Sequence, residues 1–350
     1  MKDKIITFLF VGYLSFFSVL GLALEDKEIS TTERRKLTKF PEIELNSEYI
    51  SKVDKYLLDH FPFRDEFRSI KANYNYKVLN MLDNNGIYFK DNYIFKSLYP
   101  TNTKSIENFV NHVKKMNELF PNSNIYTMIV PDKNYYLDGD ILNIDYDYIY
   151  NEVKKVGNFI DIRDTLELND YYMTDTHWKQ ERLSKVVKKM DKVMNFNYHD
   201  VSYKENVFDD FYGVYYGESA IDRDPEKLTY LTTSEFDNVR VKYLENSELN
   251  TIYNEENLKG MDAYNVYLDG ASSFIEIYND SVEERNLVVF RDSFGSSLVP
   301  LLVPYYSKIV VVDNRYIGSS YFKDLIDKEN TDVLFLYSTL LVNESGSLKN

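Results

Sequence analysis

From residue 46 onward, the hydrophobic positions alternate between helical periodicity and short continuous apolar runs. Helical segments are predicted at residues 49–60, 61–82, 103–120, 178–194 and 319–330. Continuous runs rich in Val, Ile and Leu occupy residues 124–130, 286–290, 308–312 and 332–337. Such runs, when helical segments separate them, are typical of strands buried on both faces of a parallel sheet. We therefore predict an α/β fold in which a parallel sheet is flanked by helices.

Polar residues follow directly after these apolar runs. Ligands of open parallel sheets bind beyond the carboxyl ends of the strands, so these residues are the first candidates for a site. They are Asp132, Lys133, Asp292, Ser293, Asp313, Arg315 and Ser338.

The pattern changes between residues 195 and 285. This stretch is rich in tyrosine, and its short alternating segments, such as 239–245 and 273–279, predict strands without a long helix. We interpret it as a β-rich insertion in the α/β domain.

Residues 85–97 predict a hairpin that turns at Asp91 and Asn92.

The N-terminus carries a different hydrophobic pattern. Residues 5–24 form an uncharged run of twenty residues. This is about the length that a helix needs to cross a bilayer. Lys2 and Lys4 precede the run and acidic residues follow it, which favours a cytosolic N-terminus and an extracellular remainder. We predict an uncleaved transmembrane anchor over residues 1–24, with a cleaved signal as the alternative. Residues 25–45 are polar and predict a linker, so residues 46–350 form the predicted catalytic domain.

Composition narrows the function classes. The formal net charge of −15 argues against binding of nucleic acid, because nucleic acid is bound through clustered Lys and Arg. The chain has no cysteine, which excludes disulfides, thiolate metal sites and a cysteine nucleophile. Four scattered histidines make a metal-dependent phosphoesterase a poor alternative, and the sequence predicts neither a metal nor a cofactor.

Ser293 lies between an apolar run and a helical segment. A serine on such a strand-to-helix turn is exposed at the sheet edge beside free backbone N–H groups, which can hold an oxyanion. Serine is also a common N-cap at any helix start. From its position alone, Ser293 could therefore be either a nucleophile or a helix N-cap.

Asp175 and His177 occur in the segment YYMTDTHW, residues 171–178. Residues two apart point away from each other within a helix, so we expect this pair in the extended turn before the helix at 178–194. An Asp that holds one imidazole nitrogen leaves the other nitrogen to deprotonate a hydroxyl. His177 could equally be an ordinary helix-start residue. The hypothesis gains weight because a nucleophile, a base and an orienting group occur together in one chain.

Several segments resemble the bacterial DHHW family, which is related to the SGNH-hydrolase-like alginate O-acetyltransferases. YMTDTHW is similar to the family's tyrosine-x-x-threonine-aspartate-x-histidine-tryptophan signature, and RDSFGSSLVP is similar to its nucleophile block. Further similar segments are DHFPFRDEFR, IVPDK, FDDFYGVYYGES, VVDNRY and LFLYSTLLVNES. The resemblance runs from about residue 35 to the end of the chain and implies an SGNH-hydrolase-like, flavodoxin-like fold.

The resemblance implies roles for particular residues. Ser293, His177 and Asp175 would form a catalytic triad. Thr176 stands where the family name implies a histidine, between the two triad members in the signature. The oxyanion donors of SGNH enzymes have no clear counterpart, and we take the Phe294 N–H, Gly213 and Asn279 as candidates. Lys133, Arg315 and the signature's Trp178 are further candidates to shape the substrate cleft, with ordinary ion pairs as the alternative for the two cations.

The activity that the resemblance implies is O-acetylation of an exopolysaccharide or cell-wall glycan outside the membrane. The acetyl group would come from a membrane-bound O-acyltransferase as partner, and a polysaccharide hydroxyl would accept it. A glycan acetylesterase uses the same triad and remains an alternative. A non-catalytic protein that binds polysaccharide during its assembly is the second alternative.

Overall fold

The computed structural model describes residues 2–44, 46–81, 83–84, 86–137, 139, 142–327 and 331–349. The chain divides into two compact units. The first contains residues 1–88 and 214–224, and the second contains residues 89–213 and 225–350.

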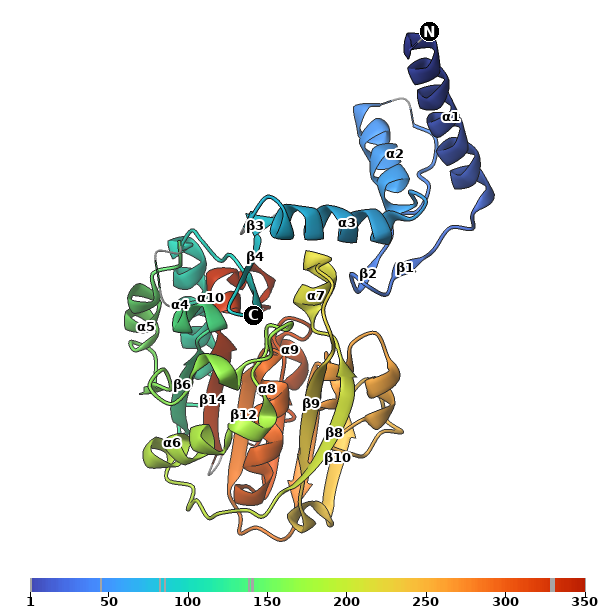
Figure 1. The fold of residues 1–350 in the computed structure, drawn as a ribbon. Coiled ribbons are helices and arrows are strands. Elements are labelled where there is room, and N and C mark those ends of the chain that lie inside the picture. The colour runs from blue at the N-terminus through green and yellow to red at the C-terminus, as the bar shows by residue number, and fades with distance from the viewer. Residues whose placement is uncertain are drawn as a thin grey trace. The chain divides into compact units, whose positions relative to one another are not determined.

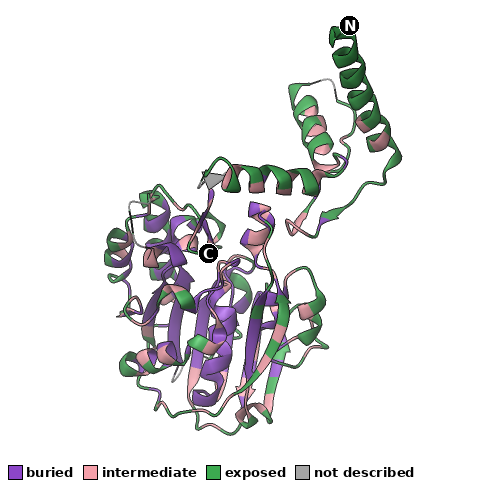
Figure 2. Cartoon of the chain, viewed as in Figure 1, coloured by how far each residue is buried: buried purple, intermediate pink, exposed green. Residues whose placement is uncertain are grey.

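The second unit is built on a seven-stranded sheet in the order β10-β11-β13-β12-β14-β6-β7 (Figure 1). Five of these strands are parallel neighbours: β13 (Lys308–Val312), β12 (Asn286–Arg291), β14 (Thr331–Ser338), β6 (Asn124–Val130) and β7 (Asn158–Ile160). The predicted α/β fold with a helix-flanked parallel sheet is therefore confirmed. Figure 2 shows the central strands as the buried part of this unit.

Alternate residues of each central strand point to opposite faces, as the pleat requires. In β12, Leu287 and Val289 face one core, whereas Val288 and Phe290 face the other. The second face is covered by α4 (Thr103–Asn117), α5 (Tyr146–Val153), α9 (Ser319–Phe322) and α10 (Thr339–Asn343). The first face is covered by α6 (Ser184–Met194), by α8 (Phe294–Leu298) with the 3-10 turn Val299–Tyr305, and by residues of β8 and β9.

Residues 195–285 contribute four strands. β8 (Lys204–Phe211) and β9 (Glu226–Thr232) form a two-stranded antiparallel sheet. β10 (Val239–Tyr243) and β11 (Phe274–Asn279) extend the central sheet, and β11 pairs antiparallel with β13. The direction of β11 is therefore opposite to that of the five parallel strands.

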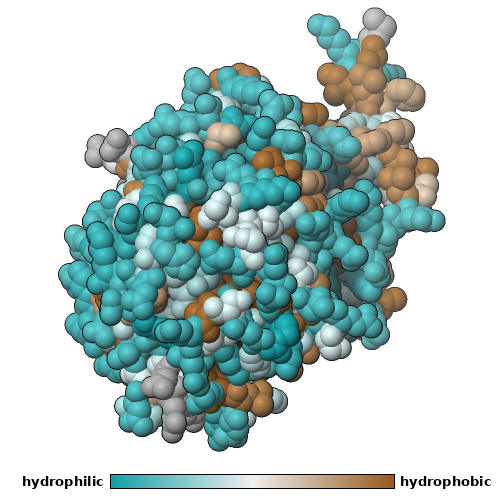
Figure 3. Space-filling model, turned by 90° about the horizontal axis from the view of Figure 1, so that it is seen from below, coloured by the Kyte–Doolittle hydropathy of each residue, from teal (hydrophilic) through white to brown (hydrophobic). Residues whose placement is uncertain are grey.

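The first unit contains α1 (Lys2–Ala23), α2 (Ser47–Asp59), α3 (Arg64–Lys77) and α7 (Val214–Ser219), with the short pair β1 (Ile29–Ser30) and β2 (Arg35–Lys36). α1 is an apolar helix of 22 residues, none of them buried. At 1.5 Å per residue it is about 33 Å long, enough to cross a hydrocarbon core. Figure 3 shows brown, apolar side chains gathered on the N-terminal segment, while the face of the second unit in this view is mostly hydrophilic.

The sheet of β3 (Asp83–Asn84), β4 (Ile87–Lys90) and β5 (Tyr93–Lys96) contains the predicted hairpin. Its turn residues Asp91 and Asn92 have φ angles of 48° and 70°. Both angles lie in the left-handed region, which Asp and Asn tolerate better than most residues.

Two predicted helices differ from the structure. The helix expected at 178–194 begins only at Ser184, after a 3-10 turn at Gln180–Arg182. The helix expected at 319–330 is reduced to Ser319–Phe322, and residues 328–330 of that prediction lie outside the described residues.

Candidate active site

The carboxyl ends of four parallel strands are joined by hydrogen bonds and ion pairs. After β6, Asp132 Oδ2 accepts a hydrogen bond of 2.7 Å from Thr339 Oγ1. After β12, Asp292 Oδ2 accepts from Ser338 Oγ at 2.6 Å. After β13, Asp313 lies 3.7 Å from the guanidinium of Arg291 at the end of β12 and also binds Arg315 at 2.6 Å. The polar residues predicted to follow the apolar runs are thus brought to one edge of the sheet.

Ser293 forms the turn between β12 and α8. It occupies the N-cap position with helical dihedral angles, and its side chain makes no capping hydrogen bond. Asp292 caps the helix instead, because its Oδ1 accepts from the Phe294 N–H at 3.0 Å. The alternative role of Ser293 as a side-chain cap is therefore excluded, and its hydroxyl is left for another partner.

That partner is His177. The Oγ of Ser293 lies 2.8 Å from His177 Nε2, and His177 Nδ1 lies 2.5 Å from Asp175 Oδ1. A carboxylate can only accept, so Nδ1 carries the proton and Nε2 accepts from the serine hydroxyl. The side chains of Asp175, His177 and Ser293 therefore form one continuous chain of hydrogen bonds, although His177 and Ser293 lie 116 positions apart in the sequence.

The loop that carries Asp175 and His177 is closed by an isolated bridge between Tyr171 and Trp178. The Tyr172 N–H donates to the His177 carbonyl at 3.1 Å across the loop. Within it, the His177 N–H donates to Asp175 Oδ1 at 2.9 Å. His177 is therefore a residue of a closed loop and not of a helix start, which corrects the expected position of the helix.

The imidazole of His177 is held between aromatic rings. It stacks on Tyr264 with centroids 3.8 Å apart and planes inclined by 9°, and Phe294 lies 4.9 Å away on a tilted plane. The Tyr264 hydroxyl is 2.8 Å from Ser297 Oγ, which fixes the tyrosine. Because His177 is 7% exposed and Asp175 1% exposed, their hydrogen bond is shielded from water.

Lys133 holds the same loop from β6. Its buried Nζ donates to the carbonyl oxygens of Tyr172, Met173 and Asp175 at 3.0, 3.1 and 2.7 Å. These three acceptors match the three N–H groups of an ammonium. Burial lowers the pKa of Lys133 to about 7, against the opposing effect of Asp175 and other nearby carboxylates. Lys133 therefore acts on the loop backbone, and the structure corrects the expectation that it lines the substrate cleft.

Glu226 binds the opposite side of the loop. Its carboxylate accepts from the N–H groups of Met173 and Thr174 and from Thr174 Oγ1, each at 2.6 Å. Together with Lys133, it fixes the backbone just before Asp175 by charge-assisted hydrogen bonds.

Trp178 connects the loop to α8, the helix that follows Ser293. Its fully buried indole N–H is 3.0 Å from the Phe294 carbonyl and 2.9 Å from Ser297 Oγ. The tryptophan of the signature thus sets the distance between the His177 loop and α8. It has no contact with the cavity beside Ser293, which corrects its assignment as a substrate-contacting candidate.

Gly213 does not supply an oxyanion donor. Its N–H donates to Thr174 Oγ1 at 3.0 Å. A Cβ at this position would lie 2.3 Å from backbone atoms of Thr174 and Asp175. Glycine is required here because the backbone of residue 213 packs directly on the loop, which corrects the prediction.

Asn279 lies at the opposite edge of the sheet. It ends the antiparallel strand β11 beside the start of β13, and its N–H donates to the Ser307 carbonyl at 2.8 Å. Its buried side-chain amide donates to the Val303 carbonyl at 3.1 Å. The prediction that it stabilises an oxyanion at Ser293 is wrong, because an antiparallel strand delivers its last residue to the other edge.

The Phe294 N–H is already bound to Asp292, so its expected role as an oxyanion donor is also corrected. The Ser293 N–H, in contrast, has no acceptor among the residues that the structure describes. It lies beside the Ser293 hydroxyl, and an anionic oxygen next to that hydroxyl could accept a hydrogen bond from it.

A cavity of about 280 Å³ opens beside Ser293. Its lining combines hydroxyl, charged and aliphatic side chains: Thr176, Asp292, Ser293, Phe294, Arg315, Ser338, Leu340, Leu341, Glu344 and Ser347. Burial opposes the charged form of Arg315, but the hydrogen bonds to Asp313 and the negative charges of Asp313 and Asp292 together raise the pKa of its guanidinium. Arg315 is therefore a fixed positive charge in the wall of this cavity.

Two residues of the site, Glu226 and Tyr264, are not predicted from the sequence. Glu226 lies 51 positions after Asp175, and Tyr264 is one of 32 tyrosines. No regular spacing in the sequence relates these two residues to the segment 171–178. Both are brought to the site by long-range packing of residues 195–285. Within the described residues, no group of three or more His, Asp or Glu side chains is arranged to hold a metal ion.

Comparison with known proteins gives a result only at the level of structure. No family model matches the sequence, and no curated protein is significantly similar to it. A crystal structure of a DHHW family protein from Eubacterium siraeum superposes with a TM-score of 0.65 and 21% identity, covering 77% of this chain and 97% of the other.

Bacillus cereus PatB1, in a structure with a sulfonyl adduct, superposes with a TM-score of 0.60 and 19% identity, covering 73% of this chain and 95% of the other. A likeness to the O-acetyltransferase domain of Pseudomonas putida AlgJ, at a TM-score of 0.47, is too weak to support a conclusion. The predicted resemblance is thus confirmed at the level of the fold: this chain has the fold of the DHHW family protein.

Proposed function

We propose that the protein is a serine O-acyltransferase that transfers acetyl groups to the hydroxyls of an extracellular or cell-wall glycan. The observation that carries the proposal is the hydrogen-bonded chain Ser293–His177–Asp175 at the carboxyl edge of the sheet. A hydroxyl bound to a neutral imidazole that is oriented by a buried carboxylate is the arrangement that activates serine for acyl transfer.

In the first half-reaction, Ser293 Oγ attacks the carbonyl carbon of the donor ester while its proton passes to His177 Nε2. The Ser293 N–H donates to the resulting oxyanion. His177 then gives the proton to the leaving alcohol, the donor ester bond breaks, and an acyl-serine remains. Asp175 stabilises the imidazolium without taking its proton.

In the second half-reaction, a sugar hydroxyl enters the cavity and gives its proton to His177 Nε2. Its oxygen attacks the acyl carbon, the ester bond to Ser293 breaks, and Ser293 recovers the proton from His177. Water follows the same course as an alternative acceptor, so slow esterase activity accompanies transfer. The choice of acetyl as acyl group and of glycan as acceptor comes from the family resemblance.

We further propose that α1 anchors the protein in the cell membrane with the remainder outside. The apolar length of α1 and the positive charges that precede residue 5 support this orientation. Acetyl groups would then reach the protein from a membrane-bound O-acyltransferase, because cytosolic acyl donors cannot cross the bilayer themselves.

The proposed function is tested with the purified full-length protein in detergent, an activated acetyl ester and a set of oligosaccharides. We expect mass spectrometry to find an oligosaccharide heavier by one acetyl group. Ser293→Ala should lose both this product and the hydrolysis of the donor while its circular dichroism spectrum stays unchanged. Release of acetate without any acetylated sugar would favour the esterase, and full activity of Ser293→Ala would refute the mechanism.

A further inference from the structure

α3 and the residues beside it carry an exposed apolar stripe. Phe63, Phe67, Ile70, Tyr74 and Val78 are 53%, 41%, 65%, 52% and 59% exposed. Their spacing of four, three, four and four residues places them on one face of the helix. A helix of a water-soluble domain normally buries such a face against its own core. An exposed apolar stripe of this kind therefore indicates an interaction surface.

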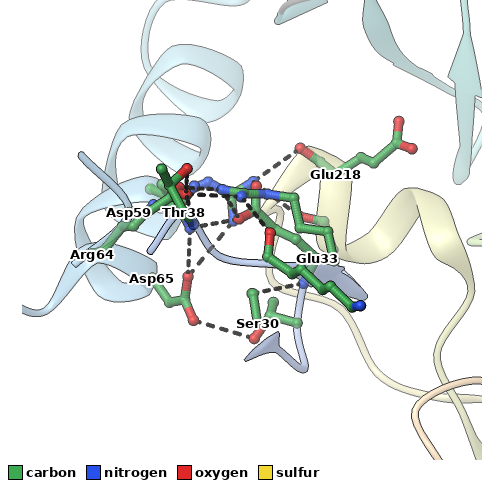
Figure 4. A network of polar contacts seen from close by, with 12 residues as sticks. Ser30, Glu33, Thr38, Asp59, Arg64, Asp65 and Glu218 are labelled. Atoms are coloured by element: carbon green, nitrogen blue, oxygen red, sulfur yellow. Dashed lines mark hydrogen bonds and ion pairs between the residues drawn. The ribbon is translucent and has the colours of Figure 1, made fainter. Parts of the chain in front are cut away.

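The opposite face of α3 is the one that packs on the protein. Arg64 and Arg68 bind Glu33 at 2.6 and 3.2 Å, and Arg68 also donates to the Gly217 carbonyl at 3.0 Å (Figure 4). Ala72 on the same side is 3% exposed. These contacts fix the rotation of the helix about its axis, so the apolar stripe is held outward.

α1 places the beginning of α3 at the level of the membrane. Phe17 of α1 stacks on Phe61 with centroids 5.2 Å apart and contacts Phe67 at 5.9 Å. Phe17 lies six residues before Ala23, the last residue of α1. At 1.5 Å per residue this is about 9 Å from the helix end, which is the depth at which interfacial helices bury their apolar face.

The direction and the charges of α3 suit the same surface. Figure 1 shows α3 running across the axis of α1, so a membrane-spanning α1 leaves α3 roughly parallel to the bilayer plane. Lys71 and Lys77 are exposed and lie on either side of the stripe in helical projection. Lysines in this position keep their ammonium groups among lipid head groups while their stems cover apolar surface.

We propose that the stripe of Phe63, Phe67, Ile70, Tyr74 and Val78 is a docking surface for lipid, lying in the interface of the outer leaflet beside α1. This inference rests on the anchoring of α1 in the proposed function and not on acyl transfer. α3 then holds the first unit flat against the membrane by a second contact, in addition to the spanning helix.

The test uses the absence of cysteine in the chain. The full-length Ile70→Cys protein is labelled with a polarity-sensitive fluorophore and reconstituted into vesicles of phosphatidylcholine and phosphatidylglycerol that contain spin-labelled lipid as quencher. Val207→Cys on β8, an apolar position with 49% exposure, is the matched control. We expect blue-shifted, lipid-quenched emission at position 70 and unquenched emission at position 207.

Flotation of the vesicles separates the possible failures. If the protein floats with the vesicles but the label at position 70 is not quenched, the docking proposal is overturned while the anchor stands. This includes a blue-shifted, unquenched label, which would mean that protein covers the stripe. If the protein does not float, both the anchor and the docking proposal fail. Acyl transfer, which is assayed in detergent, is judged separately.

Discussion

The two edges of the central sheet differ in size of cavity and in chemistry. At the amino ends of the parallel strands lies a cavity of about 640 Å³, lined among others by Asn124, Phe196, His199 and Asp332. The cavity beside Ser293 at the carboxyl edge is about 280 Å³. Yet, among the described residues that line the two cavities, only a hydroxyl of the smaller cavity is bound to an imidazole that a carboxylate orients.

The histidine at the larger cavity is placed differently. The His199 side chain is largely exposed, and its Nε2 lies 3.4 Å from Glu235. Among the described residues, its ring forms no hydrogen bond with a hydroxyl group. Arg285 in the same wall is bound by Asp332 at 2.6 Å. The comparison shows that the hydrogen-bonded Ser293–His177–Asp175 chain lies at the smaller cavity and not at the larger one, so the proposed active site rests on hydrogen-bond geometry and not on cavity volume.

If the carboxyl edge with Ser293 is the active one and the amino edge is not, Asp175→Asn should have the largest effect on activity. The amide preserves the shape of the side chain but cannot accept from Nδ1 as a carboxylate does, so His177 loses its orientation and the stabilisation of its charged form. We expect kcat for acyl transfer to fall about 10⁴-fold. Esterase and transferase rates should fall together, and an activity within a few-fold of wild type would show that the hydrogen-bonded chain is not the catalytic one.

Lys133→Met is expected to have a smaller effect, because Lys133 acts on the loop and not on the substrate. The thioether side chain has a similar length but cannot donate to the three loop carbonyls. A shift of the Asp175–His177 loop by about 1 Å costs roughly 10²-fold in turnover. We expect this loss in kcat with little change in the KM for the acyl donor. A change confined to KM would instead indicate that Lys133 binds substrate.

The same lysine predicts a pH dependence. Because the pKa of folded Lys133 is lowered to about 7, its ammonium loses a proton above that pH, and one loop carbonyl loses its donor. The wild-type rate relative to Lys133→Met should therefore decline several-fold as pH rises from about 7 to about 9.

The stability of the folded protein should change with pH in the direction opposite to that of the rate. An unfolded lysine keeps its proton until about pH 10.4, so between about pH 7 and that value the unfolded state binds more protons than the folded state. The contribution of Lys133 to the free energy of unfolding therefore increases with pH in this window. Denaturant titrations of wild type and Lys133→Met at several pH values check the sign, and parallel curves would contradict the assigned titration.

The smallest catalytic effect is expected from Asn279→Ala at the amino edge. The change removes the hydrogen bond to the Val303 carbonyl and should lower the free energy of unfolding by about 1–3 kcal/mol. Because this residue lies at the edge opposite Ser293, kcat and KM should stay within a factor of two. A large loss of kcat in a fully folded variant would mean that the two edges are functionally coupled.

The sequence could predict features that depend on local pattern. The strands β6, β12, β13 and β14 follow from continuous apolar runs, and Ser293 follows from its place after one of them. The hydrogen bond from the Ser293 hydroxyl to His177 Nε2 is a hypothesis of the sequence analysis that the geometry supports. Asn279 was misplaced because the direction of β11 depends on its pairing with β13, and apolar spacing carries no information on strand direction.

Other features depend on contacts between distant segments. The helix predicted from Trp178 begins later because Lys133 and Glu226 bind the backbone of the preceding loop. Lys133 lies 42 positions from Asp175, and Glu226 lies 52 positions from Thr174. Tyr264 reaches His177 only after the segment 195–285 has packed. No local signal in the sequence identifies such partners.

The nucleophilic character of Ser293 is tested most directly by covalent labelling. The full-length protein is treated with an aryl sulfonyl fluoride, digested and analysed by peptide mass spectrometry, in parallel with His177→Gln. We predict one sulfonyl group on Ser293, formed at least 10³-fold more slowly in His177→Gln because the base is missing. Labelling of a different residue, or equal labelling of Ser293 in both proteins, would contradict the proposed activation of Ser293 by His177.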